Sequence, residues 1–251
     1  MHDPQLTGGA LMLDDMRVLR DAVAQYRAAA TAAGLDWPEH AEAPVAQPPD
    51  LVYRLFGVDH VAEQLAWFQS QKWPPRRLLP NGGWIMPWPT DGGEELDTLA
   101  ISIGTPFPWR HQVRLFNFEH LVYTFVLAGD HEGEIWRYEF TPDIWGSARA
   151  ATSLAALFTG WTKGIAAGAV VYDDLNGWLQ LREGGHDDIA VLRERVPDVD
   201  FLTFPAYVPD ESLLRTRQRE CGIDMDCIER GFDCYEELLD TVQATRRSLG
   251  I

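Results

Sequence analysis

The chain has 251 residues and a formal net charge of −17, from 38 acidic and 21 basic residues. Its composition, 46% hydrophobic and 24% charged, excludes a disordered chain, a collagen and a simple coiled coil, because enough apolar surface exists to offset the entropy lost on folding. The negative charge disfavours direct binding of DNA or RNA, whose phosphates would be repelled, and favours encounter with a basic protein.

The N-terminus and the cysteines indicate an intracellular protein. No run of roughly 18 apolar residues is present, and acidic residues stand where a signal peptide would have a basic start. We therefore expect a cytoplasmic protein with no membrane contact. The odd number of cysteines favours reduced thiols, and their spacing is poor for a metal site, although Cys221 and Cys227 could form a disulfide in an oxidising compartment. The third cysteine is Cys234.

The N-terminal part of the chain predicts helices interrupted by a proline-rich linker. Apolar residues recur at spacings of three and four between Gly9 and Gly34, which predicts an amphipathic helix ended by glycine. Prolines predict an extended linker over 37–50. We then expect a helix over 50–56 that stops at Gly57, and another that is capped by Asp59.

The middle of the chain predicts an antiparallel sheet. Runs of β-branched and aromatic residues, separated by Gly, Pro, Asn and Asp, are typical of strands. The sequence GDHEG at 129–133 is a turn between two such runs, so they should form an antiparallel hairpin. We expect strands over 84–88, 99–104, 113–118, 122–127 and 135–140.

A helix and a second hairpin follow the predicted sheet. Ser153 can cap a helix with an apolar face, and Gly164 should end it. Asn176 and Gly177 stand between two apolar runs, which is a strong hairpin signal.

After about residue 182 the pattern becomes helical again. We expect helices that begin at Asp187 or Asp188, at Asp210, and at a capping box formed by Asp233 and Glu236. The predicted fold class is therefore α+β, with a central antiparallel sheet flanked by N-terminal and C-terminal helices. We divide the chain into a domain over 1–182 and a C-terminal helical extension over 183–251, expected to pack on the same core.

No common catalytic or phosphate-binding motif is present. His131 lies among Asp130, Glu132 and Glu134, and such a cluster could hold a hard cation or support acid–base chemistry, but an exposed acidic turn is the commoner outcome. We predict no catalytic residue, no metal ion and no cofactor. An enzyme of unrecognised type stays open as an alternative.

Ten tryptophans are many for this length, and most should lie in the core. Trp109 and Trp145 are in loops, where partial exposure would let them anchor a partner protein.

One succession of elements carries a family resemblance. A strand VYTFVL, an acidic turn AGDHEG, a strand EIWRYEF and an apolar helix in ATSLAALFTGW follow one another. This resembles the SMI1/KNR4 superfamily, which shows a Gly-x-x-Trp/Tyr element and then a helix of the form Ser-hydrophobic-x-x-hydrophobic-hydrophobic. The matching residues are Gly133, Trp136, Ser153, Leu154, Leu157 and Phe158.

The resemblance covers about residues 50–180, and parts of the family pattern differ. The early Leu-Pro-x-x-Tyr helix is not clear, unless LFGVDHVAEQLAWF replaces it, and the C-terminal segment is extra. The resemblance implies a non-catalytic protein-binding scaffold, in bacteria chiefly an immunity protein that neutralises a cognate toxin.

Charge and resemblance lead to one hypothesis, an immunity protein that binds a basic, nuclease-type toxin. A general regulatory scaffold of the same fold is the second hypothesis, and an enzyme is the third. The candidate partner-binding residues are Asp130, Glu132, Glu134, Trp109, Trp145, Asp173 and Asp174.

Overall fold

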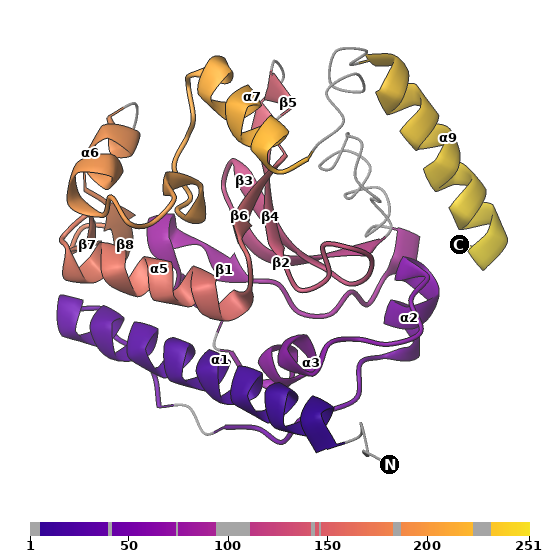
Figure 1. Ribbon diagram of the computed structural model, residues 1–251, viewed down its shortest axis with the longest axis horizontal. Helices are drawn as coiled ribbons and strands as arrows, with labels where there is room; N and C mark the ends of the chain where they lie inside the picture. The colour runs from indigo at the N-terminus through magenta and orange to yellow at the C-terminus, as the bar shows by residue number, and fades with distance from the viewer. Residues whose placement is uncertain are drawn as a thin grey trace.

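The computed structural model describes residues 6–39, 42–73, 75–93, 111–141, 144–145, 147–182, 187–222 and 232–251, and it confirms the α+β fold class (Figure 1). The side chains of 6–15, 140–141, 144–145, 232–235 and 238 lie outside this description. The helices are α1 (Leu6–Ala33), α2 (Asp50–Phe56), α3 (Glu63–Ser70), α5 (Leu154–Ala166), α6 (Asp188–Arg195), α7 (Glu211–Glu220) and α9 (Phe232–Leu249), with 3-10 turns η1 (Pro80–Gly82) and η3 (Phe201–Thr203). The strands are β1 (Trp84–Ile85), β2 (Gln112–Phe118), β3 (Leu121–Val126), β4 (Ile135–Thr141), β5 (Ile144–Trp145), β6 (Ala148–Ala151), β7 (Val170–Asp173) and β8 (Trp178–Leu181).

The main sheet is antiparallel, in the order β1-β2-β3-β4, and β5 and β6 both pair with β4. The predicted hairpin of β3 and β4 is confirmed, with Leu121 opposite Glu139 and Phe125 opposite Ile135. The strand expected over 84–88 is only two residues long, because the prolines that follow it lack the N–H that a sheet ladder needs. The strand expected over 99–104 lies outside the described residues.

The second predicted hairpin is also confirmed. Strands β7 and β8 form a separate two-stranded sheet, with Asp173 opposite Trp178. Gly177 in its turn has φ 74°, a left-handed conformation that glycine adopts without strain.

Helices α1 and α5 lie side by side, and α5 contacts strand β6 of the main sheet (Figure 1). Leu19 and Tyr26 of α1 are fully buried, which confirms the predicted apolar face for the side chains that are described. Aromatic rings fill the space between α5 and the sheet, where Phe116 of β2 meets Trp161 of α5 edge-to-face with ring centroids 5.5 Å apart. The Tyr26 hydroxyl donates to the Leu78 carbonyl (2.8 Å), so this buried polar group is satisfied.

Helix ends show where local signals are sufficient. Ser153 caps α5 as predicted, since its Oγ accepts from the Ala156 amide (3.1 Å), and α2 ends at Gly57 in a left-handed conformation. Two predictions were wrong. Helix α3 begins at Glu63, too far along the chain for Asp59 to cap it, and α5 continues past Gly164. Gly164 serves packing instead, because a Cβ there would lie 2.4 Å from the Phe204 ring.

The C-terminal helices start close to the predicted positions. Asp210 caps α7 by accepting from the Ser212 and Leu213 amides, as expected. Helix α6 begins at Asp188, but Asp187 at its N-cap makes no side-chain capping bond. Helix α9 begins at Phe232, so Asp233 stands inside the helix and not at its N-cap, and the predicted capping box is wrong.

The segment 202–206, which begins in η3 and lies between α6 and α7, is held on the sheet by buried side chains. Its successive carbonyls accept hydrogen bonds from the Tyr123 hydroxyl, the Trp161 indole, the Arg137 guanidinium and the Asn81 amide. A buried loop is stable only when its backbone polar groups find partners, and these bonds supply them.

Residues of η3 and of α7 cover the edge of the sheet that β6 forms. The Thr203 hydroxyl donates to the Ala150 carbonyl (2.9 Å), and the Gln218 amide donates to the Ser147 carbonyl (3.1 Å). Ala150 lies in β6 and Ser147 directly precedes it. These side chains therefore bond to carbonyls that an open sheet edge would leave exposed. Buried residues on both sides of position 182 join one hydrophobic core, while the division of the chain into two parts stays a prediction.

Candidate functional site: an acidic turn and the adjoining cleft

The turn at 129–133 joins β3 to β4 and carries several carboxylates. Gly129 and Gly133 have φ of 89° and 88°, so the chain reverses at positions where glycine is needed. The Gly133 amide returns to the Val126 carbonyl (2.9 Å), which closes the turn on the end of β3. Asp130, at its tip, is exposed.

Glu134 fixes the base of this turn. Its carboxylate accepts from the Trp136 indole (2.9 Å) and the Arg149 guanidinium (2.9 Å), and it contacts the His131 imidazole (3.0 Å). Only 15% of its side chain is exposed. The hydrogen bond to Glu134 raises the pKa of Arg149, so the guanidinium stays charged. Glu134 was a candidate for partner binding, but its observed contacts are internal and support the turn.

Glu132 brings the turn against a distant segment. Its carboxylate lies 3.0 Å from Nε2 of His60, whose Nδ1 lies 2.9 Å from the Asp59 carboxylate. The hydrogen bond to Asp59 raises the pKa of His60 most, followed by the hydrogen bond to Glu132. The hydrogen bond between His60 and Asp59 also lowers the pKa of Asp59. Asp59 and His60 were not identified from the sequence, because 72 residues separate His60 from Glu132. We use "acidic turn" below for Asp59, Asp130 and Glu132.

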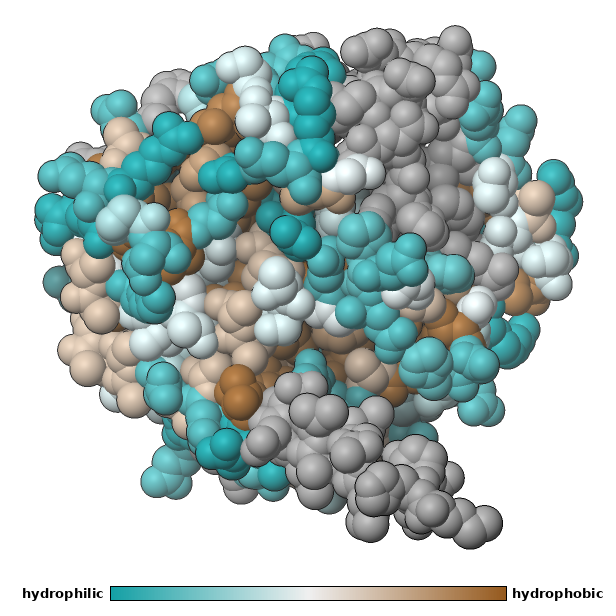
Figure 2. Space-filling model, in the orientation of Figure 1, coloured by the Kyte–Doolittle hydropathy of each residue, from teal (hydrophilic) through white to brown (hydrophobic). Residues whose placement is uncertain are grey.

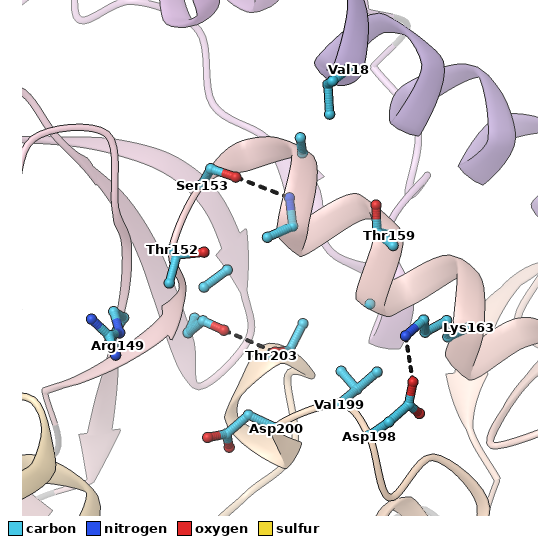
Figure 3. Close-up of a pocket in the computed structure, with 15 residues that line it drawn as sticks. Val18, Arg149, Thr152, Ser153, Thr159, Lys163, Asp198, Val199, Asp200 and Thr203 are labelled. Atoms are coloured by element: carbon cyan, nitrogen blue, oxygen red, sulfur yellow. Dashed lines mark hydrogen bonds and ion pairs between the residues drawn. The ribbon is translucent and has the colours of Figure 1, made fainter. Parts of the chain in front are cut away.

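A cleft of about 630 Å³ lies between β6, α5 and residues 198–203 (Figure 3). Small residues line much of it, and Gly160 lets α5 approach the opposite wall, since a Cβ there would lie 2.7 Å from Thr203 Cγ2. Arg149 lies at one end and the ion pair of Lys163 with Asp198 at the other. Arg149 also binds Glu134, so the cleft adjoins the acidic turn.

Two hydroxyl groups of the cleft, those of Ser153 and Thr203, serve the fold. Ser153 Oγ caps α5 and Thr203 Oγ1 donates to Ala150. Ser153 and Lys163 lie at opposite ends of the cleft (Figure 3), so the nearest lysine is not placed to activate that serine as a base. The face shown in Figure 2 has hydrophilic residues around a moderately hydrophobic band over α5.

The other predicted residues lie elsewhere. Asp173 and Asp174 are at the tip of the β7–β8 hairpin, where the Asp173 carboxylate accepts from the Leu175 amide (2.9 Å) and contacts the Asn176 amide. Trp178 of this hairpin shares a cavity with the turn at 119–120. That turn precedes β3 and the acidic turn follows it, so the two sets of carboxylates lie at opposite ends of the strand.

Trp145 lies in strand β5, so its predicted placement in a loop was wrong. The exposure of Trp145 and Trp109 stays untested, because the Trp145 side chain and the whole of Trp109 are outside the description. Cys221 has a free, half-buried thiol, and Cys227 and the Cys234 side chain also lie outside the described part.

Within the described residues, no group of three His, Cys, Asp or Glu side chains is arranged to hold a metal ion. None of the helices in the described ranges is both long and apolar enough to cross a bilayer.

Comparison with known proteins returned no matching family model, no matching curated protein and no matching solved structure. The resemblance to the SMI1/KNR4 superfamily therefore stays a prediction.

Proposed function

We propose that this chain is a protein-binding scaffold of the SMI1/KNR4 type, and that it acts in the cytoplasm as an immunity protein against a basic, nuclease-type toxin. The observation that supports this most is the acidic turn. His60 joins the carboxylates of Asp59 and Glu132 from two distant segments, the exposed Asp130 lies in the same turn as Glu132, and the net charge of the chain is −17.

The acidic turn suits fast recognition of a basic partner. Complementary charge speeds encounter, and a strongly charged chain extends that attraction beyond the contact itself. The internal contacts of Glu134 keep the turn in one conformation, so little ordering cost remains to be met on binding. Asp130 and Glu132 then serve as the contact residues, while Glu134 positions them.

The cleft supplies the second element of the proposed interface. Charge sets the rate of association and the specificity, whereas burial of a few anchoring side chains supplies most of the affinity. The 630 Å³ cleft beside Arg149 has room for such a side chain from the partner. In this proposal Trp109 and Trp145 are the chain's own anchors.

The test uses the proteins encoded next to this chain's gene. Each is expressed in a bacterial host, alone and together with the chain, and growth is followed. We expect one neighbour to arrest growth and the chain to restore it. A variant with Asp59→Lys, Asp130→Lys and Glu132→Lys should fail to restore growth.

A matched control carries the same change of charge elsewhere. Glu39, Glu194 and Asp240 are exposed and are not among the candidate partner-binding residues, so replacing all three by lysine should leave protection intact. Equal protection by both triple variants would refute the proposed interface. If every neighbour is harmless and none binds the chain, the immunity function itself is wrong.

A further inference from the structure

A second cavity, of about 390 Å³, lies at the end of β3 opposite the acidic turn. It is bounded by η1, the turn at 119–120, the β7–β8 hairpin, the start of α6 and the segment that leads to α7. Its volume is within the range of small-ligand sites. The lining residues are Asn81, Phe118, Glu119, His120, Asn176, Trp178, Gln180, Asp188 and Tyr207.

Aromatic rings and carboxylates share this cavity. Phe118, Trp178 and Tyr207 come from three different elements, and the His120 ring lies 6.5 Å from that of Tyr207. Asp188 is buried and Glu119 is exposed, and among the described residues that line the cavity there is no lysine or arginine. An anion would be repelled here, whereas an organic cation would meet both π faces and negative charge.

Trp178 already attracts a cation from the chain itself. The Arg77 guanidinium stands 4.3 Å from the centre of the indole ring and 3.9 Å from the Glu119 carboxylate. Arg77 is not among the described residues that line the cavity, so the Glu119 carboxylate is shared between this guanidinium and the cavity.

The walls are held in fixed positions. Asn81 donates to the Pro205 carbonyl (2.8 Å) and accepts from the Leu181 amide (2.9 Å), which ties three walls together. It does so at φ 52°, the one positive value among non-glycine residues in the described chain. Backbone in this region is uncommon and is often found at functional sites.

The histidine does not oppose a cation. Burial first, and then the charge of Arg137, lower the pKa of His120 below its usual value, so its ring is neutral at neutral pH.

We propose that this cavity binds the alkylammonium or guanidinium group of an organic cation, with Trp178 as the aromatic platform and Glu119 and Asp188 as the countercharges. The site is separate from the proposed toxin interface and does not depend on it. The cation can belong to a free small molecule or to a basic side chain of a protein, since both present the same chemistry.

The full chain is titrated with choline, and the indole N–H resonance of Trp178, assigned with the Trp178→Phe variant, is followed by NMR. We expect a saturable shift. The neutral carbon analogue of choline, 3,3-dimethylbutan-1-ol, should give none. Trp178→Ala should weaken binding about 10- to 30-fold, as followed by calorimetry.

Two variants keep the result interpretable if Trp178→Ala fails to fold. Glu119→Gln alters an exposed side chain and should weaken choline binding about threefold. Trp73→Phe, remote from the cavity, should leave it unchanged.

The same titration with lysine and arginine, each blocked as the N-acetyl amide, distinguishes a cation on a protein side chain from a cation on a free small molecule. If either binds more tightly than choline, the ligand is a protein side chain; if choline is tighter, it is a free small molecule. The proposal is overturned if none of the three cations gives a saturable shift, or if the neutral alcohol binds as tightly as choline.

Discussion

Replacing Arg137 tests how the segment 202–206 is held on the sheet. The guanidinium is fully buried on β4, donates to the Phe204 carbonyl (3.1 Å) and the Ala206 carbonyl (2.7 Å), and lies 3.6 Å from the Glu139 carboxylate. Arg137→Met keeps much of the volume but removes both donors and the positive charge. Glu139 is then left as a buried carboxylate without its cation.

The expected loss of unfolding free energy is large. Breaking a buried ion pair by removing one partner costs about 3–5 kcal/mol, which is a large share of the roughly 5–15 kcal/mol of a typical domain. Urea unfolding followed by tryptophan fluorescence measures it. Tyr123→Phe is the matched control, since it removes one neutral hydrogen bond to the same segment and should cost about 1 kcal/mol.

The loss should also depend on pH. Burial raises the pKa of Glu139, and Arg137 opposes this, so removing Arg137 raises the pKa further. A carboxyl whose folded pKa exceeds its unfolded value contributes stability below the unfolded value, about 4.3, and loses it as the pH rises through the folded value. Arg137→Met should therefore cost less in acid than at neutral pH. A loss no larger than that of Tyr123→Phe, with unchanged hydrogen exchange over 201–208, would refute the reasoning.

Three further predictions concern single side chains. Gly160→Ala should lower stability by about 1–3 kcal/mol in thermal unfolding, because the contact with Thr203 outweighs the gain of helix propensity; a stabilised variant would contradict this. Ser153→Ala should cost about 1 kcal/mol and Ser153→Asp much less, and equal losses would exclude capping as the cause. In an NMR titration His120 should titrate below about 6.5, so that it lowers stability in acid, and His60 should titrate above that value; the reverse order would be incompatible with the described contacts.

Local signals were sufficient wherever neighbours along the chain decide the structure. The Ser153 cap, the end of α2 at Gly57 and the two hairpins each depend on residues within a few positions of one another. Gly164 shows the limit of such signals, because the sequence does not reveal that Phe204 approaches the helix there. The sequence predicts that Gly164 ends α5, whereas in the structure the helix continues and Gly164 makes room for the Phe204 ring.

The candidate site was predictable only in part, because most of its contacts join residues that are distant in the sequence. The GDHEG turn and its exposed Asp130 follow from the sequence, but the partners of the neighbouring carboxylates do not. Glu134 and Arg149 meet because β6 pairs with β4, and Glu132 meets His60 through tertiary packing. Periodicity likewise could not show that Arg137 would be buried, since the carbonyls that it binds come 67 and 69 residues later.

The salt dependence of the association rate tests the central claim most directly. The chain is mixed in stopped flow with the neighbouring gene product that arrests growth, over a range of ionic strength. For the wild type the rate should fall steeply as salt rises, and the triple lysine variant of Asp59, Asp130 and Glu132 should associate slowly with a weak salt dependence. A wild-type rate that is independent of salt, or a triple variant that follows the wild-type curve, would contradict recognition through the acidic turn.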